Sequence, residues 1–169
     1  MDEPGQQYLN QLESLVTQRQ DWLFRFAYMR IGKREDAEDL IQDVFISLFS
    51  MIKDGREIKD LDHYILRSIS NACADYHRKQ KLLTINIDEA DEIQENNPDK
   101  PLHDEFIRIN KMLNELPPEQ AETLRLKCYD NLTFRQIADL QEISESTVKS
   151  RYRYAIKYIQ EHLKRHNNE

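Results

Sequence analysis

The chain of 169 residues carries 31 acidic and 24 basic side chains, a net charge of −7, and only 3 Gly and 5 Pro. This length fits one or two small domains, because domains most often contain about 100–150 residues. Hydrophobic residues make up 39% of the chain, below the roughly 45–50% of an average globular domain. These numbers favour small helical units with much surface and disfavour a large α/β enzyme.

Membrane and secretory segments are not indicated. No apolar run approaches the ~18 residues that cross a bilayer, and residues 1–5 lack the basic and apolar segments of a signal peptide. We therefore expect a cytoplasmic protein without membrane insertion. Cys73 and Cys128 share no CxxC spacing, so neither a disulfide framework nor a cysteine-rich zinc site is indicated.

Charge is distributed unevenly along the chain. The net charge is −2 for residues 1–83, −5 for residues 84–103 and 0 for residues 104–169. The middle segment combines six acidic side chains with Pro98 and Pro101 and few apolar residues, which is typical of a flexible linker. The prediction is an all-α protein in which two small helical domains, 1–83 and 104–169, are joined by an acidic flexible linker, 84–103.

Three helices are predicted in the first domain. The first runs from Asp21, a possible N-cap, to about Ile31, where Gly32 stops it. The second has the clearest apolar stripe, made of Ala37, Leu40, Ile41, Val44, Phe45 and Leu48. Its opposite face carries Asp36, Asp39, Gln42 and Asp43. The third begins near Asp62, and the side opposite its apolar stripe offers Arg67, Asn71 and Arg78.

The second domain begins with a helix over residues 104–116, which Pro117 ends, and Pro118 starts the next helix. Thr133 and Gln136 form a capping box that predicts a short helix to Leu140. After a turn over residues 141–143, Ser144 caps a long helix with an apolar stripe of Val148, Tyr152, Ala155, Ile156, Ile159 and Leu163. A short helix, a three-residue turn and a longer helix fit a helix-turn-helix, and Glu142 sits where many such turns hold Gly.

A helix-turn-helix places the start of its second helix in the major groove of DNA. The residues in that place are Ser146, Thr147, Lys149, Ser150, Arg151 and Arg153. Hydroxyl, ammonium and guanidinium groups suit contacts with base edges and phosphates. DNA binding is therefore favoured over the alternative, a helical hairpin with a solvated basic face.

Other chemistry has weaker support. Asp39 and Asp43 lie one helical turn apart, but a protein-docking or solvated face is favoured over a metal site because no third ligand cluster lies near in sequence. His162 and His166 share the spacing of helical zinc sites, but solvent exposure is favoured near a chain end. No Gly-rich phosphate loop or nucleophile motif occurs. We predict no metal, no cofactor and no catalytic residues.

Two stretches together resemble the extracytoplasmic-function (ECF) sigma factors of bacterial RNA polymerase, in the sigma-70 superfamily. Residues 34–45 with residues 64–71, Asp75 and Tyr76 are similar to sigma region two. Residues 116–118, 132–138 and 143–151 are similar to sigma region four. The resemblance extends from about Trp22 to Leu163, with an acidic linker between the two regions.

The resemblance implies roles for three sets of residues. Docking on the clamp helices of core RNA polymerase is implied for Asp36, Asp39, Gln42 and Asp43. Capture of the single-stranded minus-ten promoter element is implied for Tyr64, Arg67, Asn71 and Arg78, with residues 53–62 as the pocket for an extruded base. Contact with the minus-thirty-five element is implied for Ser146, Thr147, Lys149, Ser150, Arg151 and Arg153. An anti-sigma factor is the further partner that the resemblance implies.

Four positions depart from the family pattern. Relatives often have Trp where this chain has Tyr64, Gly where it has Glu142, and Arg where it has Tyr154 and Ile156. The prediction is a non-enzymatic sigma factor that directs core polymerase to promoters and assists their melting. The alternatives are a stand-alone helix-turn-helix regulator and a small helical metalloenzyme.

Overall fold

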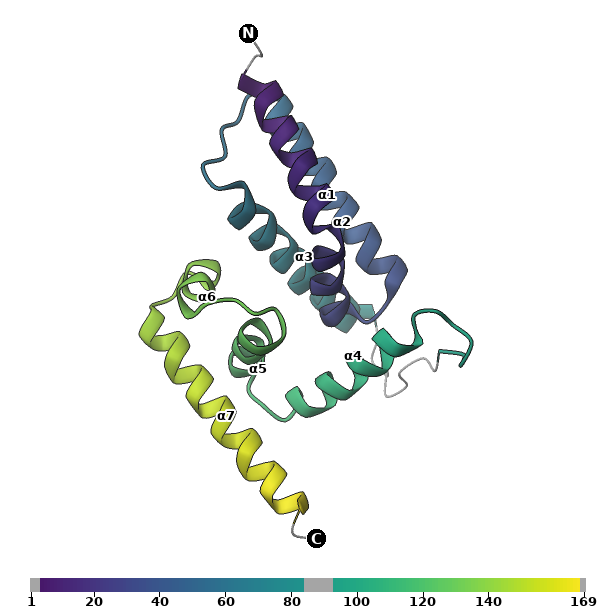
Figure 1. The fold of residues 1–169 in the computed structure, drawn as a ribbon, viewed down its shortest axis with the longest axis vertical. Helices are drawn as coiled ribbons and strands as arrows, with labels where there is room; N and C mark the ends of the chain where they lie inside the picture. The colour runs from purple at the N-terminus through teal and green to yellow at the C-terminus, as the bar shows by residue number, and fades with distance from the viewer. Residues whose placement is uncertain (1–3, 84–92, 168–169) are drawn as a thin grey trace. The chain divides into compact units, whose positions relative to one another are not determined.

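A computed structural model describes residues 4–83 and 93–167 of the chain, and these residues form helices without a strand among them (Figure 1). The helices are α1 (Pro4–Ile31), α2 (Arg34–Lys53), α3 (Leu61–Leu83), α4 (Lys100–Leu113), α5 (Pro118–Leu124), the π-helix η1 (Arg125–Tyr129), α6 (Phe134–Gln141) and α7 (Glu145–Asn167). The all-α prediction is confirmed. The chain divides into two compact units, Met1–Phe106 (unit 1) and Ile107–Glu169 (unit 2).

Unit 1 is built on three helices, α1, α2 and α3, which run side by side and pack against one another (Figure 1). Their facing sides bury a core that contains Leu23, Phe26, Ala27, Val44, Leu48, Ile65 and Ile69. The second helix follows the predicted stripe, with Ala37, Val44 and Leu48 fully or nearly fully buried. Hydrophobic burial at helical spacing therefore accounts for this bundle.

The first helix is longer than its predicted start at Asp21 allows. Helix α1 begins at Pro4, and Asp21 lies exposed in its middle, where it caps nothing. Leu12 is 6% exposed and Leu15 and Val16 are half-buried, so the apolar stripe continues toward the N-terminus. Packing of these side chains in the unit outweighs the local capping preference of an aspartate.

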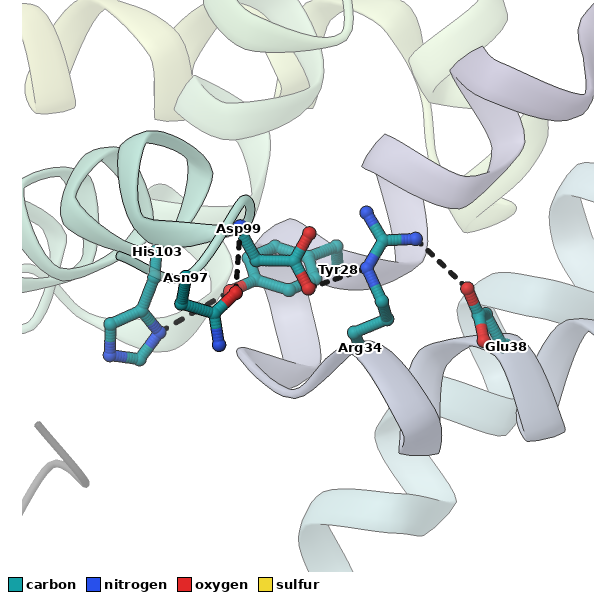
Figure 2. Close-up of polar contacts among 6 residues, drawn as sticks. All are labelled: Tyr28, Arg34, Glu38, Asn97, Asp99 and His103. Carbon is teal, nitrogen blue, oxygen red and sulfur yellow. Dashed lines mark hydrogen bonds and ion pairs between the residues drawn. The ribbon is translucent and has the colours of Figure 1, made fainter. Parts of the chain in front are cut away.

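Helix α4 lies about one turn closer to the N-terminus than predicted. It begins at Lys100 instead of Asp104 and ends at Leu113 instead of Leu116. A turn precedes it, in which the Asn97 side chain accepts a hydrogen bond from the Asp99 N–H at 2.8 Å (Figure 2). The described end of the predicted linker is therefore ordered into a turn and a helix start, while residues 84–92 lie outside the described residues. The domain boundaries at residues 83 and 103 stay a prediction.

Unit 2 has a core of Leu113, Leu116, Leu124 and Ala155, against which Ile109, Ala121, Tyr152, Ile156 and Ile159 pack. Its predicted caps are confirmed. Thr133 and Gln136 form both hydrogen bonds of the capping box at the start of α6. Ser144 accepts a hydrogen bond from the Thr147 N–H at 3.1 Å at the start of α7. These caps satisfy backbone donors that a helix start leaves free.

Two backbone features of unit 2 depart from simple helices. The helix that starts at Pro118 continues from α5 into the π-helix η1, which the sequence pattern did not predict. The turn before α7 places Glu142 in the left-handed region, at φ 55° and ψ 43°. A side chain is therefore accommodated where a Gly is common.

Candidate functional site

Helix α2 exposes a continuous strip of side chains, which we call the α2 outer face: Asp39, Gln42, Asp43, Ile46 and Phe49. These positions recur at three- and four-residue spacing and therefore lie on one side of the helix. Ile46 is 61% exposed and Phe49 is 50% exposed, beside the three polar side chains. The sequence analysis missed this apolar pair, although its signal was visible as two large apolar residues outside the buried stripe.

Asp36 differs from the other predicted docking residues because its carboxylate is already occupied. It is half-buried and accepts a hydrogen bond from the Tyr76 hydroxyl of α3 at 2.6 Å. Burial, together with this bond to Asp36, raises the pKa of Tyr76 above its ordinary value. Asp36 thus holds α2 against α3, while Asp39 and Asp43 are exposed and can face a partner.

A groove of about 600 Å³ runs between α2 and α3. Among the described residues, Lys79 is the one cation that lines it, beside four carboxylates: Asp36, Asp39, Asp43 and Asp75. Tyr64 and Asn71 lie in the same groove, over an apolar floor that includes Leu40, Val44 and Leu48. The structure therefore brings two of the predicted minus-ten residues next to the predicted docking residues. An excess of carboxylates disfavours phosphates here and leaves an aromatic ring and an amide available for an uncharged group.

The four predicted minus-ten residues share the helical spacing of α3 but not the same surroundings. Tyr64 is half-buried, with its hydroxyl 3.5 Å from the Met51 sulfur, and Asn71 is exposed. Arg67 is half-buried, and Arg78 forms an ion pair with Asp75. The arginines do not line the groove, so the described cation of this helix that lies in it is Lys79.

Helix α7 presents the predicted DNA-binding residues at the start of the second helix of the helix-turn-helix. Ser146, Lys149, Ser150 and Arg153 are exposed, and Thr147 and Arg151 are half-buried. The Lys149 ammonium lies 3.3 Å from the Glu145 carboxylate, one turn earlier. These groups therefore lie at the helix end that such motifs insert into the major groove.

A second groove, of about 420 Å³, follows α7. It is lined by Phe134, Lys149, Tyr152, Arg153, Ile156, Lys157 and Gln160. Within residues 4–83 and 93–167, three cations at four-residue spacing and no carboxylate line this groove, which makes it basic, in contrast to the groove of unit 1. Ile156 lines it, whereas Tyr154 is 64% exposed outside it. The arrangement suits an anionic polymer that follows the helix.

Metal-binding side chains do not gather within residues 4–83 and 93–167: no group of three or more His, Cys, Asp or Glu there is placed to hold an ion. The His162 ring lies against Glu115, at 3.6 Å from its carboxylate, and stacks on Tyr158. The Tyr158 hydroxyl donates to the same carboxylate at 3.0 Å, which raises the pKa of Tyr158. His162 thus takes part in a small surface network with Glu115 and Tyr158.

Within the described part of the chain, every helix is too short or too polar to span a membrane.

Two family models match separate parts of the chain. Residues 15–82 match Sigma-70 region 2, and residues 106–159 match Sigma-70, region 4. The first range contains the α2 outer face and the acidic groove, and the second contains the helix-turn-helix. The matches therefore fall on the two parts of the chain that carry the candidate surfaces.

Curated relatives extend the similarity over most of the chain. The ECF RNA polymerase sigma factor SigE of Mycolicibacterium smegmatis is 25% identical over 93% of this chain and 63% of its own length. This chain thus spans less than two thirds of that relative. RNA polymerase sigma factor SigV of Bacillus subtilis is 23% identical over 88% of each chain. ECF RNA polymerase sigma factor SigM of Bacillus subtilis is 27% identical over 89% of this chain and 86% of its own.

Solved structures share the fold. CnrH, determined in complex with the cytosolic domain of CnrY, has a TM-score of 0.65 and 18% identity over 90% of this chain and 87% of its own. The sigma factor RpoE from Bartonella quintana, determined with the anti-sigma factor NepR, has a TM-score of 0.62 and 21% identity over 90% of this chain and 96% of its own.

Proposed function

The chain belongs to the sigma-70 family as an ECF sigma factor with regions 2 and 4, and we propose that it binds core RNA polymerase, directs it to promoters and assists their melting. The observation that carries the proposal is the pairing of an exposed acidic and apolar face in unit 1 with a basic helix-turn-helix in unit 2. A stand-alone DNA-binding regulator needs the second surface but not the first.

The α2 outer face has the composition of a protein-docking surface. Ile46 and Phe49 are exposed, so a partner that covers them would remove their apolar surface from water, which favours binding. Aromatic side chains such as Phe49 contribute much of the binding energy in many interfaces. Asp39 and Asp43 select a partner whose matching surface is basic. We assign this face to the clamp helices of the polymerase's largest subunit, because the family docks there through the equivalent residues.

The acidic groove suits an unpaired base better than a DNA strand. Tyr64 offers a ring for stacking, and Asn71 offers an amide that can both donate and accept hydrogen bonds. The carboxylates repel phosphates, so the sugar–phosphate backbone would run outside the groove, past Arg67. Stacking and hydrogen bonds inside the groove would then offset the free energy of unstacking a base during melting.

The basic groove of unit 2 provides the duplex contact. Ser146 and Ser150 would face base edges, while Lys149, Arg153 and Lys157 would follow the phosphates along α7. This assigns the minus-thirty-five element to unit 2. The polymerase supplies the covalent chemistry of transcription, so the protein itself acts as a non-enzymatic factor, in the cytoplasm where the polymerase works.

Control by an anti-sigma factor is part of the proposal. The related sigma factor RpoE from Bartonella quintana was crystallised with the anti-sigma factor NepR. An inhibitor that covers the α2 outer face would compete directly with the polymerase, because the exposed apolar pair can be buried against one partner at a time.

The test is equilibrium binding of the full chain to core RNA polymerase. We expect tight binding by the natural protein and its loss in the double variant Gln42→Ala, Asp43→Ala. Gln20→Ala with Asp21→Ala is the matched control, because it removes an adjacent amide and carboxylate that are likewise exposed in the middle of a helix. Equal binding by all three proteins would contradict the assigned face, and no binding by any of them would favour a stand-alone regulator.

A further inference from the structure

The exposed side of α7 carries two neighbouring rows of side chains, each at four-residue spacing. The cation row is Lys149, Arg153 and Lys157, and the uncharged row is Ser146, Ser150 and Tyr154. The cation row lines the basic groove, whereas the uncharged row lies outside it. One helix therefore offers charged and uncharged groups side by side to the same partner.

Tyr154, the last member of the uncharged row, is not used by the fold of unit 2. It is 64% exposed, and within residues 4–83 and 93–167 no hydrogen bond or ring contact engages it. Tyr158, one turn later, differs: its hydroxyl donates to Glu115 at 3.0 Å and its ring stacks on His162, at 6.2 Å between centroids. The fold thus holds Tyr158 in place and leaves the Tyr154 ring available to an external partner.

The place of Tyr154 along α7 suits a long side chain. Ser146 lies in the first turn of the helix, and Tyr154 lies eight residues, or about 12 Å, further along the axis. A recognition helix contacts base edges chiefly through its N-terminal residues, so its axis is farther from the bases at Tyr154 than at Ser146. A tyrosine can bridge that larger distance, whereas a serine is too short.

This proposal rests on the proposed function, because it concerns how unit 2 reads its DNA element. We infer that Tyr154 is a specificity-determining residue whose ring packs on the C5-methyl group of one thymine in the minus-thirty-five element. Tyr154 continues the row of Ser146 and Ser150, which are assigned to base edges, and not the row assigned to phosphates.

The thymine methyl is the group in the major groove that suits this ring. Bases in a duplex stack on one another, so their faces are closed to an aromatic side chain. The base edges in the major groove display hydrogen-bonding groups and, at thymine, one methyl group. An uncharged ring without a partner of its own matches that methyl group, and cytosine at the same position offers none.

The test uses the complex of the full chain with core RNA polymerase. A random duplex library is enriched on the complex of the natural chain, and the enriched duplex is the probe. Each thymine of its upstream element is then replaced singly by deoxyuridine, which removes the C5-methyl group and keeps the base pair. Affinities are measured for the natural chain, Tyr154→Phe, Tyr154→Ala and Tyr158→Ala. Tyr158→Ala is the matched control, because it removes the same kind of ring one turn further along the helix.

We expect deoxyuridine at one thymine to weaken binding by the natural chain about fourfold, the factor for burial of one methyl group. Tyr154→Phe and Tyr158→Ala should keep this factor. Tyr154→Ala should weaken binding to the thymine duplex by a similar factor and show no further loss with deoxyuridine, because both changes remove the same contact. Its slope of log affinity against log salt should match that of the natural chain, because no charge is removed.

Three results would overturn the contact between Tyr154 and thymine. The first is the same deoxyuridine factor in Tyr154→Ala as in the natural chain at every thymine, and the second is an enriched upstream element without thymine. The third is a loss in Tyr154→Phe as large as that in Tyr154→Ala, which would show that the hydroxyl binds a phosphate.

The same experiment separates this proposal from the proposed function. If the complex with the natural chain enriches no duplex, the proposed function fails, and the base contact fails with it. If the complex enriches a duplex and the deoxyuridine factor does not depend on Tyr154, the proposed function stands and the assignment of Tyr154 alone is wrong.

Discussion

Helices α2 and α7 are similar in length and burial but opposite in exposed chemistry. They contain 20 and 23 residues, and each buries one apolar stripe, with Val44 and Leu48 in α2 and Val148 and Ala155 in α7. The exposed side of α2 combines carboxylates with two large apolar side chains, whereas that of α7 combines hydroxyls with cations. The buried stripe explains the fold of each helix, and the exposed side is the basis of the partner proposed for it.

The same comparison explains how an acidic protein can carry a basic surface suited to the proposed DNA contact. The net charge of −7 belongs to the whole chain, but a partner responds to the field at the surface that it contacts. The groove along α7 holds three cations, and the groove beside α2 holds four carboxylates and one lysine. Substitutions on one helix should therefore leave the binding of the other helix's proposed partner unchanged.

The largest effect is expected from the apolar pair of α2. Ile46→Ala with Phe49→Ala should weaken core polymerase binding at least about 30-fold, because truncation of a buried interface anchor typically costs about 2 kcal/mol or more. Thermal stability should change little, since both side chains are exposed. Equilibrium binding and circular dichroism melting of the same preparations measure both quantities.

Leu163→Ala is the control for that pair, because Leu163 is 53% exposed on α7, outside the proposed docking face. It should leave polymerase binding unchanged. Equal losses of polymerase affinity in the control and in the α2 variant would mean that any exposed apolar side chain contributes to binding. That result would contradict the assignment of the docking face to α2.

The next effect concerns α7 and DNA. Lys149→Ala and Arg153→Ala should each weaken promoter binding and lower the slope of log affinity against log salt by about one, because each removes about one phosphate contact. Lys164→Ala, on the same helix but outside the basic groove, is the control and should leave the slope unchanged. Titrations at several salt concentrations measure the slopes. Equal slopes in all four proteins would argue against the assigned phosphate contacts.

Local patterns in the sequence predicted those elements that depend on neighbouring residues. The capping box at Thr133 and the cap at Ser144 join residues three positions apart, and neighbouring members of the α2 stripe lie close in sequence. Such features follow from helical geometry and backbone hydrogen bonding alone. They suffice for the all-α fold and for placing the helix-turn-helix.

Features that depend on distant residues were not predictable in this way. Asp99 belongs to a segment with the composition of a linker, and its pairing with Arg34 depends on a residue 65 positions away. The first half of α1 is held by tertiary burial of Leu12, which outweighs a local signal at Asp21. Ile46 and Phe49 form no part of the buried stripe, so the role proposed for them depends on a partner that the chain itself does not contain.

A smaller effect is expected where α2 meets α3. Tyr76→Phe should destabilise unit 1 by about 1 kcal/mol, because it removes a partly buried hydrogen bond to the Asp36 carboxylate. Tyr154→Phe is the control, since Tyr154 is 64% exposed, and it should have no effect. Denaturant unfolding of the full chains measures the difference. Equal stabilities of the natural protein and Tyr76→Phe would mean that hydrogen bonds from water to the Asp36 carboxylate are as favourable as the one from Tyr76.

The same bond predicts a pH dependence. Folding raises the pKa of Tyr76, so the folded state keeps its proton at a pH where the unfolded chain, with a tyrosine pKa of about 10, has lost it. The stabilisation is therefore complete below about pH 10 and declines as the pH rises above that value. The free-energy difference between the natural protein and Tyr76→Phe should shrink over that range, and a constant difference would contradict the assignment.

The smallest effect is expected in the turn before α7. Glu142 adopts a left-handed backbone conformation at φ 55°, which costs an L-residue about 1 kcal/mol. Gly would avoid that cost. Part of this gain would be lost, because Gly has more conformational freedom in the unfolded chain. Glu142→Gly should therefore stabilise unit 2 by up to about 0.5 kcal/mol. Asn131→Gly, at φ 59°, should gain less, because Asn tolerates this conformation. Urea unfolding distinguishes the two variants, and destabilisation by Glu142→Gly would show that contacts of the Glu142 side chain outweigh the backbone cost.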